Sequence, residues 1–307
     1  MHATSIKTQL LAMMLAPLLI AAAVPVLAQG QQSPQSGNSA RDAQNAVRMN
    51  VPAGGRDMRA SEVIGKQVKN PQGENLGDIE DLVIDIDNQR VSYVVLSFGG
   101  IANIGDKQFA LPAGRLQPGE RERDPLVLNA SKEELEKAPG FSPDKRPNFS
   151  EETYRGAVDR YFFKEETARH TPSGARLISA EQLIGKDVND RAAHSAGEIE
   201  DLVVNFGTGR AYAVLEVDKA LSPKDKLVAL PLKAFSFPQR PDLDLLLNVD
   251  RPLIENARGL GKDEWADVNA AAARRQIDSE LARFQGQVKS NPGATQTGRE
   301  SSSGASR

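Results

Sequence analysis

Alternating apolar and polar residues dominate the middle of the chain. Residues 81–87 read DLVIDID, in which apolar side chains alternate with aspartates. A period of two is typical of a strand with one buried face. We expect the buried face to hold Leu82, Ile84 and Ile86 and the solvated face to hold Asp81, Asp85 and Asp87. Val83 breaks this pattern as an apolar residue on the outer face.

A predicted hairpin follows from the same pattern. Turn-forming residues lie at 87–89, and a second apolar run covers 91–98. Further short strands are predicted at 67–70, 108–111 and 126–128. So many short strands in one stretch favour a small antiparallel barrel, because closure removes the unpaired edges that a flat sheet exposes.

The pattern returns later in the chain at a constant offset of 120 residues. Residues 77–83 read GDIEDLV and residues 197–203 read GEIEDLV. After one deletion the offset becomes 119, and both 110–112 and 229–231 read ALP. Identities in register over this length indicate a duplicated domain. In the second copy we expect Leu202, Val204 and Phe206 inside, Asp201 and Asn205 outside, and Val203 in the place of Val83.

Helical segments are predicted around the strands. Ser131 is placed to cap a short helix that runs to Ala138. A second helix after Ser150 carries an aromatic stripe, which we interpret as core packing. A longer helix over 263–284 has an apolar stripe that faces either the second barrel or another protein. The two stripes comprise Tyr154, Val158, Tyr161 and Phe162, and Trp265, Val268, Ala272, Ile277, Leu281 and Phe284.

The first 28 residues are typical of a secretory signal peptide. A polar start with one cation, Lys7, precedes the uncharged run 10–27, and the VLA-Q junction favours cleavage after Ala28. The run just reaches the length of a membrane span, so a retained anchor is the alternative, which Pro17 and Pro25 disfavour. We therefore expect a periplasmic protein without a transmembrane anchor after cleavage. Peripheral association with a membrane is left open.

Composition and charge exclude several classes of function. The chain has 38 Lys+Arg and 41 Asp+Glu, so its formal net charge is -3, which argues against a nucleic-acid partner. It has no cysteine, which excludes disulfides, cysteine-ligated metals and thiol catalysis. The histidines His2, His170 and His194 are not at metal-ligand spacing. We expect no enzyme, no catalytic residue, no metal site and no cofactor. Polar stretches over 29–58 and 289–307 predict disordered ends.

The combined pattern resembles the PRC-barrel family. The residues that carry the resemblance are IGKxV at 64–68, GxIEDLV at 77–83, YVVL at 93–96, FGG at 98–100, GDK at 105–107 and ALP at 110–112. The resemblance covers 59–141 and, more loosely, 176–262, where the Gly-Gly loop is lost. It implies a small β-barrel that serves as an adaptor and docks on other macromolecules. It also implies that no catalytic residues are shared.

Two features remain as candidates for binding. One is the acidic group Asp78, Glu80, Asp81, Asp85 and Asp87, because calcium prefers oxygen ligands, although the glycine and bidentate glutamate of a calcium loop are missing. The other is the loop 99–105, which carries Ile101 and Ile104 where polar residues are expected. With Val83 and Val203 these residues form a candidate docking patch. The alternative is that flanking helices cover the outer face of the barrels.

The sequence thus predicts a mainly β protein with flanking helices, built as two small antiparallel PRC-type β-barrels in tandem with disordered termini. The expected function is a non-enzymatic, exported adaptor or scaffold that binds a protein or protein complex of the bacterial envelope. The alternatives are a carrier of a small ligand or metal ion, which uses a barrel mouth or the acidic strand face, and an enzyme with a site between the barrels. The predicted boundaries are a signal peptide (1–28), a linker (29–58), the first barrel (59–141), a helical connector (142–175), the second barrel (176–262), a C-terminal helix (263–288) and a tail (289–307).

Overall fold

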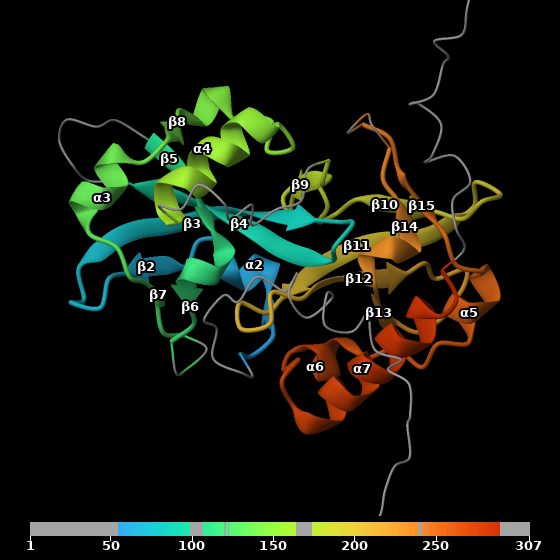
Figure 1. Cartoon of the computed structure of the whole chain (residues 1–307). Helices are drawn as coiled ribbons and strands as arrows, with labels where there is room; N and C mark the ends of the chain where they lie inside the picture. Colours follow the sequence, from blue (N-terminus) through green and yellow to red (C-terminus); the bar gives the residue numbers. More distant parts are fainter. Residues whose placement is uncertain are drawn as a thin grey trace, which may run out of the picture. The chain divides into compact units, whose positions relative to one another are not determined.

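The computed structural model describes residues 55–98, 107–119, 121, 123–163, 174–238, 240 and 242–288. The predicted signal peptide, most of the linker and the C-terminal tail lie outside these residues. The described chain is mainly β and forms two sheets, one for each copy of the duplicated sequence (Figure 1). We call residues 57–163 repeat 1 and residues 177–285 repeat 2. The first seven residues of each, 57–63 and 177–183, are its leading segment.

The sheet of repeat 1 curls into a half-barrel with the strand order β6-β7-β2-β3-β4-β5-β8. All neighbours in it pair antiparallel except β2 and β7, which are parallel. Its elements are β2 (Gln67–Lys69), β3 (Asn75–Asp85), β4 (Arg90–Phe98), β5 (Lys107–Pro112), β6 (Leu116–Gln117), β7 (Leu126–Leu128), α3 (Lys132–Lys137), β8 (Gly140–Phe141) and α4 (Glu152–Phe163).

Repeat 2 reproduces this arrangement with the strand order β13-β12-β11-β10-β15-β14. Here β10 and β15 form the parallel pair, at the position of β2 and β7. Its elements are β10 (Asp187–Asn189), β11 (Ser195–Val204), β12 (Ala211–Val217), β13 (Leu227–Leu230), β14 (Phe235–Ser236), β15 (Leu245–Leu247), α5 (Arg251–Glu255), α6 (Lys262–Trp265) and α7 (Ala271–Gln285). The leading segments hold β1 (Met58–Arg59), α2 (Ala60–Val63) and β9 (Leu177–Ser179).

One residue explains the change of offset from 120 to 119. In repeat 1, Val83 pairs with Tyr93 and Ile84 pairs with Val91, which leaves Ser92 as an extra residue in β4. In repeat 2 the corresponding positions of β11 and β12 pair without an extra residue. A β-bulge therefore absorbs the inserted residue, and the pairing on both sides of it stays in register.

The predicted solvated face of the central strands is buried, and this corrects the sequence-based expectation. The core positions are as predicted, with Leu82, Ile84 and Ile86 all buried. Four of the five predicted polar positions are buried as well, because other parts of the chain cover the outer face: Asp81 and Asp85 are 0% exposed, and Asp201 and Asn205 are 3% and 2% exposed. The fifth, Asp87, keeps 41% of its side chain exposed, as predicted. The alternation of apolar and polar residues thus predicted the strands correctly, but the prediction that their polar residues face solvent was wrong at most positions.

Two of the helix predictions are confirmed. The Ser131 hydroxyl accepts a hydrogen bond from the Glu134 N–H at 3.1 Å and caps α3. Helix α4 buries Val158 and Phe162, so its stripe packs in the core as predicted. The Ser150 hydroxyl, however, accepts a hydrogen bond from the Leu177 N–H at 3.0 Å, so it binds the leading segment of repeat 2.

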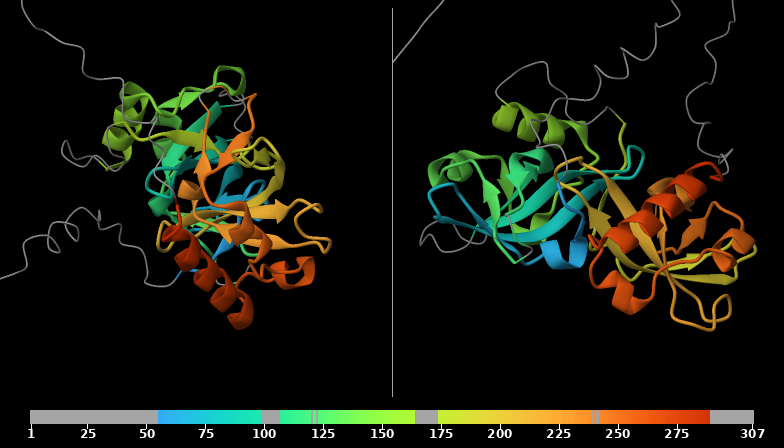
Figure 2. Two further views of the ribbon diagram at one scale, coloured as in Figure 1. Left: turned by 90° about the vertical axis from the view of Figure 1, so that its right-hand side faces the viewer. Right: turned by 90° about the horizontal axis from the view of Figure 1, so that it is seen from below.

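The predicted long C-terminal helix is instead two helices, α6 and α7. Between them, the Asp267 carboxylate accepts hydrogen bonds from the N–H groups of Asn269 (3.0 Å) and Ala270 (3.1 Å). Such a local turn competes with continued helix, which is why the element is interrupted. The stripe packs on the second barrel, with Ala273 buried in place of the predicted Ala272 (Figure 2).

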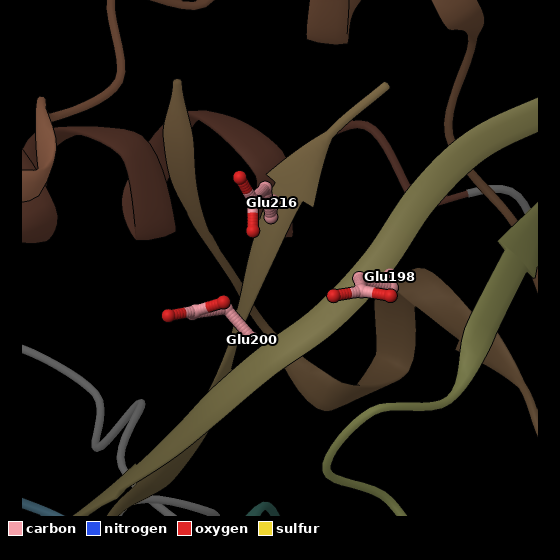
Figure 3. Close-up of side chains that lie close together, drawn as sticks. All are labelled: Glu198, Glu200 and Glu216. Carbon is pink, nitrogen blue, oxygen red and sulfur yellow. The ribbon is translucent and has the colours of Figure 1, made fainter. Parts of the chain in front are cut away.

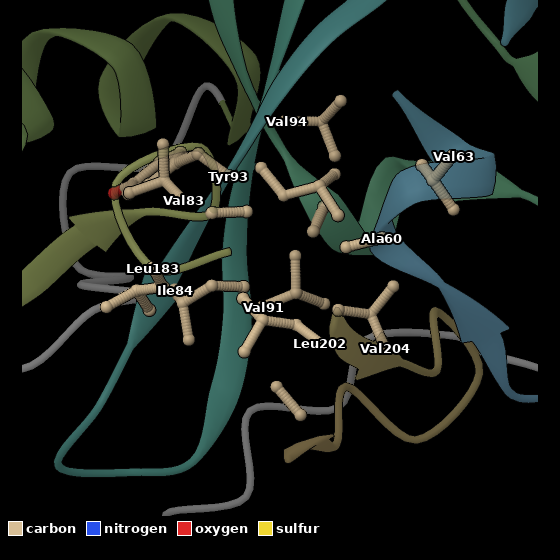
Figure 4. Packing of buried hydrophobic residues seen from close by; sticks show 14 of the residues in the cluster. Ala60, Val63, Val83, Ile84, Val91, Tyr93, Val94, Leu183, Leu202 and Val204 are labelled. Atoms are coloured by element: carbon tan, nitrogen blue, oxygen red, sulfur yellow. The ribbon is translucent and has the colours of Figure 1, made fainter. Parts of the chain in front are cut away.

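The hydrophobic core is shared between the repeats. A single cluster of buried residues includes side chains of β3 and β4 together with side chains of β11 and both leading segments (Figure 4). A second cluster lies between β12, β13 and α7. In the part of the chain that the structure describes, no helix is long and apolar enough to cross a membrane.

Candidate functional site

The two repeats exchange their leading segments. Strand β1 of repeat 1 pairs antiparallel with β11 of repeat 2, where Met58 lies opposite Val204. Strand β9 of repeat 2 pairs antiparallel with β3 of repeat 1, where Ile178 lies opposite Ile84. The two pairings are related by the offset of 120 residues. Each repeat therefore contributes its first short strand to the sheet of the other repeat.

Apolar residues of the leading segments continue this exchange. Ala60 and Val63 in α2 and their counterparts Ala180 and Leu183 are all buried. Figure 4 shows Leu183 beside Ile84 of repeat 1, and α2, which carries Ala60 and Val63, packs against β11 of repeat 2. Fully burying a side chain of this size stabilises the fold by about 1.5–3 kcal/mol. Each barrel is therefore completed by side chains of the other repeat.

A buried aspartate anchors each exchanged segment. Asp201 accepts hydrogen bonds from the Ser61 N–H at 3.2 Å and from the Ser61 hydroxyl at 2.5 Å. Asp81, its counterpart, accepts a hydrogen bond from the Glu181 N–H at 3.3 Å and another from the Ser179 hydroxyl. Ser61 and Glu181 are again 120 residues apart. The strands therefore carry these aspartates to bind the partner repeat.

Burial controls the protonation of these two aspartates. Loss of water raises the pKa of Asp81 and that of Asp201 above the ordinary value for a carboxyl group. The hydrogen bonds from Ser179 and Ser61 oppose this rise, and so does the Arg146 guanidinium, whose Nη1 lies 2.9 Å from the Asp81 Oδ2. Both groups therefore act as acceptors that link the repeats, and neither is open to solvent.

The hairpin turns of the two repeats meet at the centre of this interface. Arg90 and Arg210 form an antiparallel bridge, and these residues correspond at offset 120. The Val91 N–H donates to the Gly209 carbonyl at 3.0 Å, and the Ala211 N–H donates to the Gln89 carbonyl at 2.8 Å. The contacts on the two sides are thus equivalent, as a local two-fold axis requires.

The structure changes the view of the predicted docking patch. Val83 and Val203 are 0% exposed, which corrects the expectation that they lie on a free surface. Val83 packs in the shared core, and Val203 packs in the cluster that α7 covers. The alternative interpretation, that flanking helices cover the outer face, is correct at Val203, which packs against α7, whereas Val83 is buried in the core that the two repeats share. Ile101 and Ile104 lie outside the described residues.

The acidic group of repeat 1 does not form one face. Asp78 and Glu80 are exposed, whereas Asp81 is buried against repeat 2. The Asp85 carboxylate accepts hydrogen bonds from the N–H groups of Asp87 (3.1 Å) and Asn88 (3.0 Å). Asp85 therefore closes the β3–β4 turn and is already satisfied without a cation.

A cluster of three carboxylates lies in repeat 2 instead. Oxygen atoms of Glu198, Glu200 and Glu216 lie within 4.8 Å of one another (Figure 3). Glu198 stands opposite Glu216 in the β11–β12 ladder, and Glu200 occupies a bulge next to it. The alternation within one strand did not reveal this cluster, because its third member comes from the neighbouring strand. The pairing register is the signal that would have found it.

A lysine already neutralises part of this cluster. The Lys262 Nζ in α6 lies 3.1 Å from a carboxylate oxygen of Glu216. Burial raises the pKa of Glu200, and the nearby Glu216 raises it further, while the charge of Lys262 lowers it. The arrangement offers oxygen ligands to a cation, but the ammonium group of Lys262 competes with such a cation for the negative charge of the carboxylates.

Two exposed leucines mark another surface of repeat 2. Leu243 and Leu246 are 41% and 46% exposed, and they are the large apolar residues with this degree of exposure in the described ranges. Leu246 lies in β15, between Asn189 of β10 and Ser236 of β14 in the sheet register. We call this pair of leucines the β15 patch. The predicted docking residues did not include it.

Comparison with known proteins agrees with this geometry. The family model for the PRC-barrel domain matches residues 55–135 and 176–244, which cover the central strands of both sheets. No curated protein shows a match to the chain. The chain belongs to the PRC-barrel family and carries two PRC-barrel domains in tandem.

Proposed function

We propose that this protein is a non-enzymatic adaptor of the bacterial envelope, which joins other macromolecules through its tandem PRC-barrel domains. The observation that carries the proposal is the use of the buried polar groups. Asp81 and Asp201 serve to connect the repeats, and Asp85 serves to close a turn. The groups that would ordinarily suggest chemistry are thus committed to building a two-barrel scaffold.

The β15 patch is the contact surface that this proposal uses. Leu246 in β15 and Leu243, two residues before that strand, both expose apolar surface, and exposed apolar surface is a typical feature of sites where another protein binds. The partner that we expect is a protein of the envelope, because residues 1–28 have the pattern of an export signal. Export itself is tested by sequencing the N-terminus of the protein isolated from cells, which we expect to begin at Gln29. A mature chain that still begins at Met1 would contradict export with cleavage.

Site-specific photocrosslinking in living cells tests the contact surface. We would place a photoreactive amino acid at Leu246 of the full-length chain and, as a control, at the exposed Gln72 in repeat 1. The proposal expects one discrete adduct from position 246, its loss when Leu243→Asp is added, and none from position 72. The same pattern of adducts from both positions would show that the β15 patch has no specific partner.

The alternative function is a carrier of a metal ion or small ligand. The cluster of Glu198, Glu200 and Glu216 is the observation that favours it, and the competing Lys262 is the observation against it. Elemental analysis and native mass spectrometry of the purified protein separate the two. A stoichiometric metal that is lost in Glu216→Gln would make the carrier function the better one. A protein that is isolated without metal and binds none when calcium is added would contradict the metal-carrier function.

A further inference from the structure

The interface between the repeats is self-complementary. The strand pairing of the leading segment 57–63 with repeat 2 has a counterpart in the pairing of segment 177–183 with repeat 1. The contacts of the Asp57 carboxylate are made on one side, because the corresponding residue is Leu177. The paired hydrogen bonds at the β-hairpin turns lie on the local axis between them. An interface of this kind is isologous, the type that ordinarily joins two copies of one protein.

The described end of the covalent connection extends the β9 contact, because the Arg176 carbonyl accepts a hydrogen bond from the Ile86 N–H at 3.2 Å and the Arg176 guanidinium binds Asp87. The chain leaves repeat 1 after α4 at Phe163 and enters repeat 2 at Leu177. The ladders of β1 with β11 and of β9 with β3 contain no residue of the range 164–176, which joins the repeats. The noncovalent contacts include two short ladders, the hydrogen bonds between the hairpin turns, the carboxylates of Asp57, Asp81 and Asp201, and the buried apolar residues of the leading segments.

From this geometry we infer that the leading segments are homotypic docking elements. Each half of the molecule recognises the other without the covalent connection, and a second copy of this chain provides an equivalent partner. In the intact chain the connector favours the internal partner, because a short linker holds it at an effective concentration in the millimolar range. Once the connector is cut, repeat 1 of one copy docks on repeat 2 of another. The inference goes beyond the adaptor role and does not depend on it.

A cleavable connector provides the first test. A protease site inserted between Ala168 and Arg169 of the full chain is cut after the protein has folded. We expect the two halves to elute together at micromolar concentration, with the mass of one intact chain by light scattering. Halves that separate or precipitate after cutting would overturn the inference, because the connector would then be what holds the repeats together.

Cysteine trapping shows whether halves exchange between copies. The chain has no cysteine, so one copy carries Met58→Cys and a second copy carries Val204→Cys, the positions paired in the β1–β11 register. Antiparallel partners hold their Cβ atoms about 4.5–5.5 Å apart, close enough to form a disulfide after a small adjustment. After cutting, mixing and oxidation, we expect a disulfide in roughly half of the Met58→Cys halves, the statistical share when halves exchange freely.

A matched pair within one half serves as the control. Val214 and Ala229 are buried register partners in β12 and β13 of repeat 2. Chains with Val214→Cys and Ala229→Cys should form no disulfide with each other, because exchange of halves never separates these two strands. Uncut chains should show at least tenfold less of the Met58–Val204 product. Equal yields from the exchange pair and the control pair would mean that disulfides form by random collision, and the inference would fail.

A single hydroxyl group tests the specificity of docking. Ser61→Ala removes the hydroxyl that donates to Asp201 at 2.5 Å, and Ser61 is itself exposed, so the fold of repeat 1 should tolerate the change. We expect the dissociation constant of the cut halves to rise about tenfold, as for loss of one hydrogen bond to a charged group. An unchanged dissociation constant, with unchanged circular dichroism, would show that the aspartate does not contribute to recognition.

Discussion

Repeat 1 and repeat 2 each bury a tyrosine of the second long strand, but they satisfy it differently. The Tyr93 hydroxyl donates to Asp159 on helix α4 at 3.0 Å. Its counterpart Tyr212 donates to Asp57 in the leading segment of repeat 1 at 3.3 Å. Repeat 1 thus uses a helix that follows its own strands, whereas repeat 2 takes a carboxylate from the other repeat.

Each repeat also ends in a helix that packs on its own sheet, α4 in repeat 1 and α7 in repeat 2. Helices α4 and α7 pack on β5 and β13, which are equivalent strands (Figure 2). The offset of 119 residues continues through both helices, so that Arg155, Val158, Asp159 and Phe162 correspond to Arg274, Ile277, Asp278 and Leu281. The duplication therefore includes these two helices as well as the strands. The polar contacts around these helices have diverged: Arg210 binds both Asp57, at 2.9 Å, and Asp278 of α7, also at 2.9 Å. Repeat 2 should depend more on the other repeat than repeat 1 does.

The strongest test of this comparison removes the two tyrosine partners. Asp57 is 2% exposed and accepts hydrogen bonds from Asn205, Arg210 and Tyr212. We expect Asp57→Ala to lower the free energy of unfolding by about 3–5 kcal/mol, because it removes the buried acceptor that Asn205, Arg210 and Tyr212 share and leaves Arg210 with Asp278 alone. Asp159 is 8% exposed, and Asp159→Ala should cost less, about 1–3 kcal/mol. Urea unfolding of both variants checks the order, and an equal or reversed order would contradict it.

Core truncations in the leading segments should act on the opposite repeat. Leu183→Ala should cost about 3 kcal/mol, and Val63→Ala about 2 kcal/mol, since both side chains are buried. In hydrogen-exchange mass spectrometry, Leu183→Ala should reduce protection in β3 and β4 more than in β11 and β12. Val63→Ala should show the reverse. Loss of protection confined to the mutated repeat would show that the exchange contributes little to stability.

The tyrosine hydroxyls should contribute less than their acceptors. Tyr212→Phe leaves Asp57 with its hydrogen bonds from Arg210 and Asn205, so we expect a loss of only about 1 kcal/mol. Tyr93→Phe should cost a similar amount. Thermal unfolding of both variants measures this, and a loss as large as that of Asp57→Ala would mean that the tyrosine, not the arginine, is the essential donor.

The smallest expected effect is a change of stability with pH, to which a buried aspartate in each repeat contributes. Burial raises the pKa of Asp81 and Asp201 in the folded state, so folding binds protons between the ordinary value, 3.8, and the raised value. Their contribution to stability is therefore greatest in acid and falls as the pH rises through this window. Relative to wild type, Asp201→Asn should become more stable as the pH is raised from 4 to 7. Urea unfolding at several pH values measures the difference, and a difference that falls with pH would contradict the burial argument.

The sequence predicted the strands well because their period and the duplication are local or regular signals. It failed at Asp81, Asp85 and Val83 because alternation assumes that one face of a strand meets water. Both faces of β3 are buried over residues 81–85, and β9, which pairs with this part of the strand, lies nearly a hundred residues further along the chain. Strands β1 and β9 are also too short to show a period.

The candidate sites were harder to predict for a related reason. The cluster of Glu198, Glu200 and Glu216 depends on strand register and on a bulge, which periodicity does not specify. The break before α7 depends on the Asp267 turn and on Asn269, whose side chain accepts a hydrogen bond from the Asp57 N–H at 3.1 Å. Pairing between strands decides the first feature, and a local turn together with one contact from a distant segment decides the second.

The exchange of leading segments also affects how the protein reaches its folded state during synthesis. Ile84 pairs with Ile178, which emerges 94 residues later, and Met58 must wait still longer for Val204. At about 5–20 residues per second, β3 spends several seconds or more without the strand that covers it. The N-terminal repeat therefore cannot finish folding before the C-terminal repeat is made, which is the usual order in multidomain proteins. Its two barrels must finish folding together, and the newly made first half is the form most in need of a chaperone.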